Sequence, residues 1–189
     1  MPIDVDHEQR MNDIARATIS VVKERGAEGV TVRAVAERLG GSTTLVTNFL
    51  PTRGDLLLNA VRFILDGWND EMTRTLAGVP ADEYFAAYSR WNISTAGDDQ
   101  AYRRLLIEVV ASSGSYPVAQ HAIRGFSREN HETLLEAARA ADATTPEFAA
   151  DVIHLVLRGF YLASLEDPER WAYERMAPII DRLLVLVSE

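Results

Sequence analysis

Five short polar side chains lie close together in one segment, and their chemistry suits the base edges of DNA. They are Ser42, Thr43, Thr44, Thr47 and Asn48. An asparagine side chain can make a bidentate hydrogen bond to adenine, and a threonine methyl group can contact the methyl group of thymine. Hydroxyl groups can also bind base edges or phosphates. These residues are therefore candidates for sequence-specific contacts in a major groove.

A threonine and an arginine stand on either side of this segment. Thr31 and Arg33 fall at the predicted start of one helix, and Thr52 and Arg53 at the predicted start of another. Unpaired backbone N–H groups and the positive end of the helix dipole attract anions at such positions. We therefore expect both pairs to bind DNA phosphates.

These residues can act together only if two short helices hold them. The pattern predicts a helix that begins after Thr31 and a second that Ser42 caps. Ala36 is small enough for a close helix crossing, and Gly40 can adopt the left-handed conformation of the turn. The positions that fall in the interface are Val35, Leu39, Val46 and Phe49. This pattern is typical of a helix-turn-helix, and the alternative is a structural corner with a polar outer face.

The rest of the chain is also predicted to be helical. Asp6 and Gln9 form a capping box that predicts the start of the first helix, and Thr52 with Asp55 predicts the start of the fourth. Periodicity predicts further helices near 54–77, 82–95, 99–113, 118–141, 147–165 and 170–188, with turns at 96–98 and 114–117 among them. We expect an all-α fold with a helix-turn-helix domain in residues 1–52 and a larger helical domain in residues 53–189.

Composition excludes several classes of function. The chain has 189 residues and no cysteine, which excludes disulfides, thiolate metal sites and cysteine nucleophiles. Its net charge is −9, with seven basic against eight acidic residues up to Asp55 and twelve against twenty after it. That balance argues against a basic nucleic-acid coat and against binding to anionic membranes. With no signal-peptide pattern and no apolar run of ~18 residues, we expect a soluble, cytoplasmic protein.

Three consecutive motifs carry a family resemblance. They read GVTVRAVAERLG at 29–40, STTLVTNFL at 42–50 and PTRGDLL at 51–57. Together they resemble, without a gap, the DNA-binding domain of the TetR family of transcriptional regulators. The chain departs from common family residues at Gly41, Thr44, Asn48, Phe49 and Leu50. It also has Thr47 where many members carry a DNA-contacting tyrosine, and Arg53 where they carry a lysine.

A weaker resemblance covers the last two predicted helices. The runs LRGFYLASL at 157–165 and PIIDRLL at 178–184 look like the helices with which the family dimerises. The resemblance implies a homodimer held by a four-helix bundle, and an internal core stripe is the alternative. The candidate interface residues are Leu155, Gly159, Leu162, Ile179, Ile180, Leu183, Leu184 and Val187.

The family resemblance also implies a small-molecule pocket in the C-terminal domain. Its candidate lining residues are aromatic, with two histidines as polar groups, and filling of the core is the alternative for each. They are Trp68, Tyr84, Tyr88, Trp91, Tyr102, Phe126, Phe160, His121 and His154.

Metal binding and catalysis find no support in the motifs. Asp151 precedes His154 by three residues, a spacing that puts two ligands on one helix face, but a bundle metal site needs a second such pair. The sequence has no glycine-rich phosphate loop and no Gly-x-Ser-x-Gly motif. We therefore expect no metal, no cofactor and no enzymatic activity.

These inferences combine into one hypothesis and two alternatives. The hypothesis is a dimeric transcriptional regulator that binds double-stranded operator DNA, as a repressor that a small-molecule effector releases. The first alternative is a helical sensor protein that has lost operator binding, and the second is an enzyme built on a helical bundle. Binding to operator DNA separates the first alternative from the hypothesis.

Overall fold

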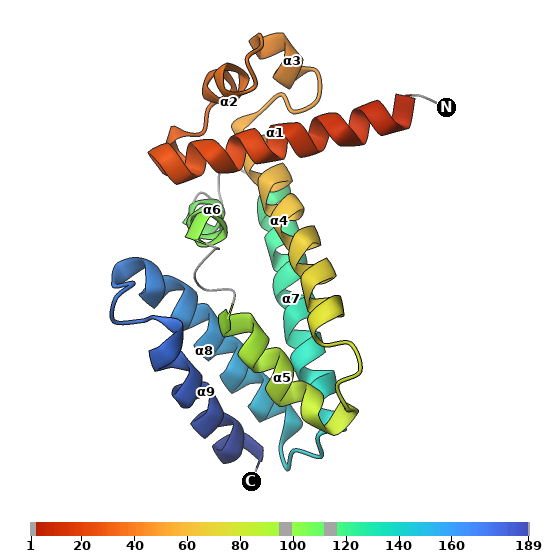
Figure 1. Ribbon diagram of the computed structural model, residues 1–189, viewed down its shortest axis with the longest axis vertical. Coiled ribbons are helices and arrows are strands. Elements are labelled where there is room, and N and C mark those ends of the chain that lie inside the picture. Colours follow the sequence, from red (N-terminus) through yellow and green to blue (C-terminus); the bar gives the residue numbers. More distant parts are fainter. Residues whose placement is uncertain (1–2, 95–99, 112–116, 189) are drawn as a thin grey trace. The chain divides into compact units, whose positions relative to one another are not determined.

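The computed structural model describes residues 3–94, 100–111 and 117–188, and every regular element in these ranges is a helix (Figure 1). The α-helices are α1 Ile3–Arg25, α2 Val32–Arg38, α3 Thr43–Thr47, α4 Arg53–Thr75, α5 Ala81–Ser94, α6 Gln100–Ala111, α7 Pro117–Ala140, α8 Pro146–Glu166 and α9 Tyr173–Ser188, and a short 3₁₀ turn, η1, spans Ala27–Gly29. The predicted all-α class is confirmed. The turns predicted at 96–98 and 114–116 lie outside the described residues.

The chain forms two compact units. The first comprises residues 1–68 and 101–124, and the second comprises residues 69–100 and 125–189. Helices α4 and α7 each contribute residues to both units. The first unit extends past residue 52 into the first half of α4, and the domain division predicted after residue 52 stays a prediction.

Helix α1 supplies the apolar base of the first unit. Ile14, Ala15, Thr18 and Val22 are buried, and the Thr18 hydroxyl donates to the Ile14 carbonyl at 2.8 Å. The helix begins at Ile3, so the prediction that Asp6 caps it is wrong. Gln9 donates instead to Asp13, four residues further on, at 3.0 Å. Gly26 ends the helix with φ 75°, the left-handed conformation that glycine adopts without strain.

Helices α5, α8 and α9 pack together as the core of the second unit (Figure 1). Ile153 and Leu157 of α8 and Ile180 of α9 are buried in it. An exposed ion pair joins Arg90 of α5 to Asp181 of α9 at 2.7 Å. Helix α8 is long and apolar enough to cross a membrane by length and composition, a criterion that core helices of soluble proteins also meet.

Candidate functional site

The turn between α2 and α3 has the geometry that the sequence predicts. Gly40 adopts φ 69°, and the N–H groups of Gly40 and Gly41 donate to the carbonyls of Glu37 and Ala36 at 3.1 and 3.0 Å. These bonds satisfy carbonyls that the end of a helix would otherwise leave unpaired. Val35, Ala36 and Val46 are buried where the two helices meet. Leu39 and Phe49 are only half-buried.

Glycine at position 41 is explained by its neighbour Leu45. A Cβ atom at position 41 would lie 3.3 Å from Leu45 Cδ1, a tight contact. The leucine side chain thus lies close to the position that an aliphatic side chain at 41 would need. The departure of Gly41 from the family pattern is compensated within the same turn.

The five candidate base-reading residues lie on the solvent side of α3. Ser42, Thr43, Thr44, Thr47 and Asn48 are all exposed. Ser42 stands at the N-cap position, but its hydroxyl makes no capping hydrogen bond. The buried Val46 fixes the opposite side of the helix. The structure therefore brings these polar groups together on one outward face.

Thr31 and Arg33 lie on the surface at the start of α2. The Thr31 hydroxyl accepts a hydrogen bond from the Ala34 N–H at 3.0 Å, which is the predicted cap. Arg33 is 84% exposed and pairs with Glu37 one turn along the helix, at 3.0 Å. Such an exposed pair contributes little to stability, so this guanidinium can turn toward a phosphate.

Thr52 and Arg53 are placed differently from the prediction. Arg53 donates to the carbonyls of Val30 and Ala27 at 3.0 and 2.8 Å, and it pairs with Glu108 of α6 at 2.8 Å. The Thr52 hydroxyl and N–H both donate to the Asp55 carboxylate, at 2.6 and 3.0 Å. An internal carboxylate thus occupies the start of α4, and the guanidinium holds the turn before α2. Both side chains thus make internal contacts that the sequence analysis did not anticipate, and the phosphate contacts of this pair stay a prediction.

His7 is a neighbour of α3 that the sequence analysis missed. The His7 and Phe49 rings lie 5.2 Å apart, which places the exposed imidazole of α1 next to the end of the candidate reading helix. No local spacing signals this contact, because 42 positions separate the two rings in the chain.

The aromatic candidates for an effector pocket are divided between the two units. Trp68 and Tyr102 lie in the first unit with ring centroids 4.4 Å apart, edge to face. Tyr84, Tyr88 and Trp91 lie in the second, along one face of α5, with successive centroids 5.9 and 6.0 Å apart and nearly parallel rings. Phe160 is buried there and Phe126 is half-buried. His121 is exposed and belongs to the first unit.

A hydrogen-bonded cluster surrounds Tyr88 in the second unit. Asn130 of α7 donates to the Tyr88 hydroxyl oxygen at 2.7 Å and contacts His154 Nδ1 of α8 at 3.2 Å. Ser127 Oγ lies 3.4 Å from His154 Nε2. Burial, assisted by the charge of Arg158, lowers the pKa of His154 to about 4, and burial raises the pKa of Tyr88. Both groups are therefore neutral near pH 7.

The sequence analysis identified Tyr88 and His154 but missed the α7 residues that connect them. Ser127, Asn130 and His131 recur at the three- and four-residue spacing of one helix face, a signal present in the sequence. His131 Nε2 bonds to Asp151 at 2.7 Å. The carboxylate considered as a metal ligand is thus paired with an imidazole, and the described residues contain no group of three metal-ligating side chains.

The candidate dimer residues separate into an exposed and a buried set. Leu155, Leu162 and Ile179 are 69%, 48% and 36% exposed, and Gly159 is also exposed. Leu183 is half-buried. Ile180, Leu184 and Val187 are buried within the chain, so their assignment to a surface is corrected. They recur at the i, i+4, i+7 spacing of the core-facing stripe of α9, and the outward apolar residues of this helix are Ile179, Val185 and Leu186.

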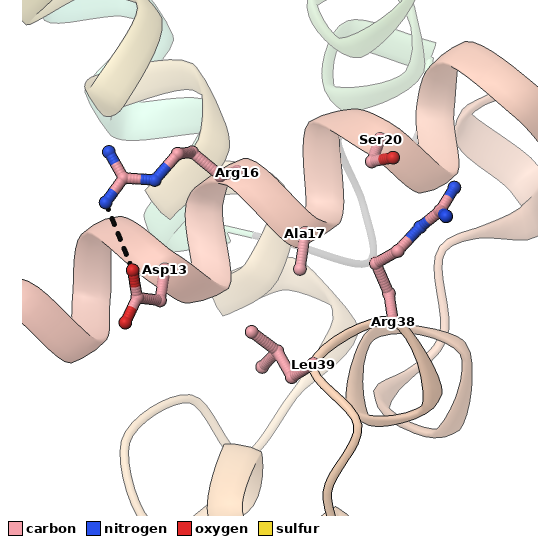
Figure 2. Close-up of a pocket in the computed structure, with 6 residues that line it drawn as sticks. All are labelled: Asp13, Arg16, Ala17, Ser20, Arg38 and Leu39. Carbon is pink, nitrogen blue, oxygen red and sulfur yellow. Dashed lines mark hydrogen bonds and ion pairs between the residues drawn. The ribbon is translucent and has the colours of Figure 1, made fainter.

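A shallow groove of about 300 Å³ lies between α1 and the end of α2 (Figure 2). Asp13, Arg16, Ala17 and Ser20 line it from α1, and Arg38 and Leu39 from the end of α2. Figure 2 shows Arg16 bonded to Asp13, at 3.1 Å, and Arg38 is bonded to Glu24. The groove contains none of the predicted effector residues, and its charged side chains already have internal partners.

Comparison with curated proteins places this helix-turn-helix among transcriptional regulators. The chain is 35% identical over 72 residues to the HTH-type transcriptional regulator PksA of Bacillus subtilis, an alignment that covers 38% of this chain and 35% of that protein. It is 23% identical over 184 residues to the HTH-type transcriptional regulator BetI of Vibrio parahaemolyticus, covering 94% of this chain and 91% of that one. The chain thus spans about a third of the first relative's length in its alignment. No family model matches the chain.

Solved structures agree along nearly the whole chain. A TetR transcription regulator from Haloarcula marismortui matches with a TM-score of 0.85 at 13% identity, over 96% of this chain and 100% of that one. A Saccharomonospora viridis protein solved in complex with choline matches with a TM-score of 0.82 at 16% identity, over 94% of this chain and 96% of that one.

The site and these comparisons define an all-helical protein whose helix-turn-helix is similar to those of transcriptional regulators. More particularly, the chain has the fold of the TetR family of transcriptional regulators. The family resemblance found in its motifs is confirmed at the level of the fold.

Proposed function

We propose that the chain is a homodimeric repressor that binds operator DNA through α3 and leaves it when a small molecule binds the helices of the second unit. The single observation that carries the DNA-binding part is the outward face of α3, with five short polar residues exposed opposite the buried Val46. Thr31 and Arg33 supply phosphate contacts beside it. Arg53 holds the turn before α2 through the carbonyls of Val30 and Ala27.

A second copy of the chain supplies the second reading helix. The exposed apolar residues of α8 and α9, with Gly159 among them, form a face that a symmetric partner can cover. Two α3 helices must lie about 34–36 Å apart to enter successive major grooves on one side of the duplex. Dimerisation through α8 and α9 would set that distance.

Arg53 is the group that would transmit a movement of α6 to the DNA-binding helices. Its guanidinium binds the Glu108 carboxylate of α6 together with two carbonyls of the turn before α2. All four groups belong to the first unit. A ligand that favours another position of α6 would shift the helix-turn-helix by as much as its differential affinity for the two states allows.

The effector belongs to the second unit in this proposal. Its Tyr84, Tyr88 and Trp91 rings form an aromatic face, and Asn130 and His154 add polar groups. The choline complex of the Saccharomonospora viridis protein supports small-molecule binding in this fold.

Selection of DNA from a random library tests the proposal. We expect purified protein to enrich a palindromic sequence that two protomers occupy. The variant Thr47→Ala/Asn48→Ala should enrich a different or less defined sequence, whereas the control Thr73→Ala, an exposed threonine of α4, should enrich the palindrome. No enrichment by the wild-type protein would contradict the proposal and favour the sensor without operator binding, an alternative that the near-neutral charge up to Asp55, seven basic against eight acidic residues, supports.

A further inference from the structure

Trp91 of α5 carries a buried hydrogen-bond donor that the described residues do not satisfy. The side chain is 8% exposed, and its indole N–H finds no acceptor among the described residues. Leaving a buried donor unpaired costs about 1–3 kcal/mol, so such groups in native proteins call for a reason. A bound molecule that offers a hydrogen-bond acceptor to the indole N–H would be such a reason.

The Tyr88 hydroxyl is a second donor on α5, the helix that carries Trp91, because of the hydrogen bonds around it. Because Asn130 Nδ2 donates to the Tyr88 oxygen at 2.7 Å, the Asn130 Oδ1 atom faces His154 Nδ1 and must accept its hydrogen. The neutral imidazole then accepts from the Ser127 hydroxyl at Nε2. In this series of hydrogen bonds, Ser127 donates to His154, His154 donates to Asn130, and Asn130 donates to Tyr88. The hydroxyl hydrogen of Tyr88 is therefore directed away from Asn130.

Arg158 adds a positive charge on the same face of α8 as His154. Its guanidinium lies over the Tyr161 ring at 5.9 Å and is close enough to depress the pKa of His154. The ion pairs of the second unit join Arg90 to Asp181, His131 to Asp151 and Arg139 to Glu147. They leave Arg158 without a carboxylate partner in the described part of the chain. Asp151, one turn before His154, is already bonded to His131.

We propose that Trp91, Tyr88 and Arg158 bind the carboxylate of a small aromatic or apolar acid. All three offer donors or positive charge to a ligand and none offers a negative charge, so an anionic acceptor fits and a cation does not. The nearly parallel rings of Tyr84, Tyr88 and Trp91 supply an apolar face for the rest of the ligand. This inference rests on the proposed effector role of the second unit, and it names the chemical class of that effector.

Three probes of equal size test the charge of the ligand: phenylacetate, phenylacetamide and phenethylamine. The full chain has three tryptophans, so its ¹H–¹⁵N spectrum shows few indole signals, and Trp91→Phe assigns the one that matters. We expect phenylacetate to shift the Trp91 indole signal and to bind at least tenfold more tightly than phenylacetamide. Phenethylamine should bind more weakly than either. Equal affinities, a preference for the amine, or no shift with any probe overturns the proposal.

Charge-matched variants locate the site. Arg158→Gln should abolish the preference for phenylacetate, and Tyr88→Phe, which keeps the ring, should weaken phenylacetate binding about fivefold. Arg175→Gln is the control, because this arginine of the same unit stacks on Trp171 and loses the same charge. A preference that survives Arg158→Gln, or that Arg175→Gln removes, overturns the assignment of Arg158.

Operator binding in the absence of probe separates this inference from the proposed function. If the protein selects no DNA but discriminates phenylacetate through Arg158, the repressor proposal fails and the carboxylate site stands. If it selects a palindrome but shows no carboxylate preference, the proposed carboxylate site is wrong and the proposed regulator function is supported.

Discussion

The reading face of α3 and the polar cluster around Tyr88 differ in the exposure and the internal pairing of their hydrogen-bonding groups. On α3 the polar side chains are exposed, and the apolar contacts that position them come from residues within the same turn and the preceding helix. Around Tyr88 the polar groups are partly buried and form hydrogen bonds with partners on three helices. Exposed groups keep their hydrogen-bonding capacity for DNA, whereas the partly buried groups around Tyr88 use most of their donors and acceptors for internal hydrogen bonds and leave only specific donors.

This difference indicates that recognition of DNA bases and recognition of a small molecule depend on different arrangements of polar groups. Base recognition needs several interchangeable donors and acceptors on one rigid face. Small-molecule recognition needs few donors in fixed directions, supported by neighbours whose own bonds are complete. The free-energy effects of substitutions on α3 should therefore be local and additive. Those of substitutions around Tyr88 should be non-additive, because the residues there share one hydrogen-bond network. The predictions below test that contrast from the largest expected effect to the smallest.

Breaking the apolar face of α8 should have the largest effect on DNA binding. Leu155→Glu/Leu162→Glu places two charges on the proposed dimer face, so we expect monomers and a loss of operator affinity of about 100-fold or more, because bivalent binding is lost. Sedimentation equilibrium and anisotropy titrations measure the two effects. The control Val110→Glu changes an exposed apolar residue of α6 and should stay dimeric. Dimers of the double variant with full affinity would contradict the assignment.

Truncating one reading side chain should have a smaller and sequence-dependent effect. Asn48→Ala removes an exposed amide from α3, and we expect a loss of about 1–3 kcal/mol on the selected operator with relaxed choice at one base position. Thermal unfolding should not change, since the side chain is exposed. If affinity and base preference are both unaltered, Asn48 makes no base contact.

Substitution of Arg53 tests whether this arginine is an internal anchor or a phosphate contact. Arg53→Met leaves two carbonyls and Glu108 without their donor, so the free energy of unfolding should fall by about 1–3 kcal/mol. The slope of log affinity against log salt should stay constant. Arg62→Met, an exposed arginine of α4, is the control. A slope reduced by about one, with unchanged stability, would restore the phosphate contact that the sequence suggests.

Acidification should weaken the cluster around Tyr88. The folded protein holds His154 neutral down to a pKa of about 4, while the unfolded chain binds the proton near the ordinary value of 6.5. Stability is therefore complete above about pH 6.5 and falls as the pH drops toward 4, because the unfolded state takes up the proton first. Denaturant unfolding of His154→Gln should show a smaller loss over this range than the wild type. The exposed His121→Gln should behave like the wild type.

The sequence predicts most of the helix-turn-helix because its signals are local. The Thr31 cap, the left-handed Gly40 and the buried Val35 and Val46 each follow from spacing within a few residues. The internal contacts of Arg53 were missed for the same reason. Its partner Glu108 lies 55 positions away, and no local pattern shows that the guanidinium turns inward.

The second unit was harder to predict because its contacts are distant in sequence. The helices and the aromatic candidates follow from periodicity, but the bond from Asn130 to Tyr88 spans 42 residues. On α9, an amphipathic pattern indicates an apolar stripe without showing which partner covers it. Hence Ile180, Leu184 and Val187 were placed on a dimer surface, although they fill the core.

Anisotropy titrations on the selected operator and a scrambled duplex, at 50 and 200 mM salt, test the central claim most directly. The account predicts that the operator binds at least about 10³-fold more tightly than the scrambled duplex. It also predicts a shallow salt slope of about −2 to −4, because base contacts dominate and few cations, Arg33 and Arg38 among them, are exposed beside each α3. Equal affinity for both duplexes with a steep slope would contradict it, since α3 would then bind DNA by charge alone.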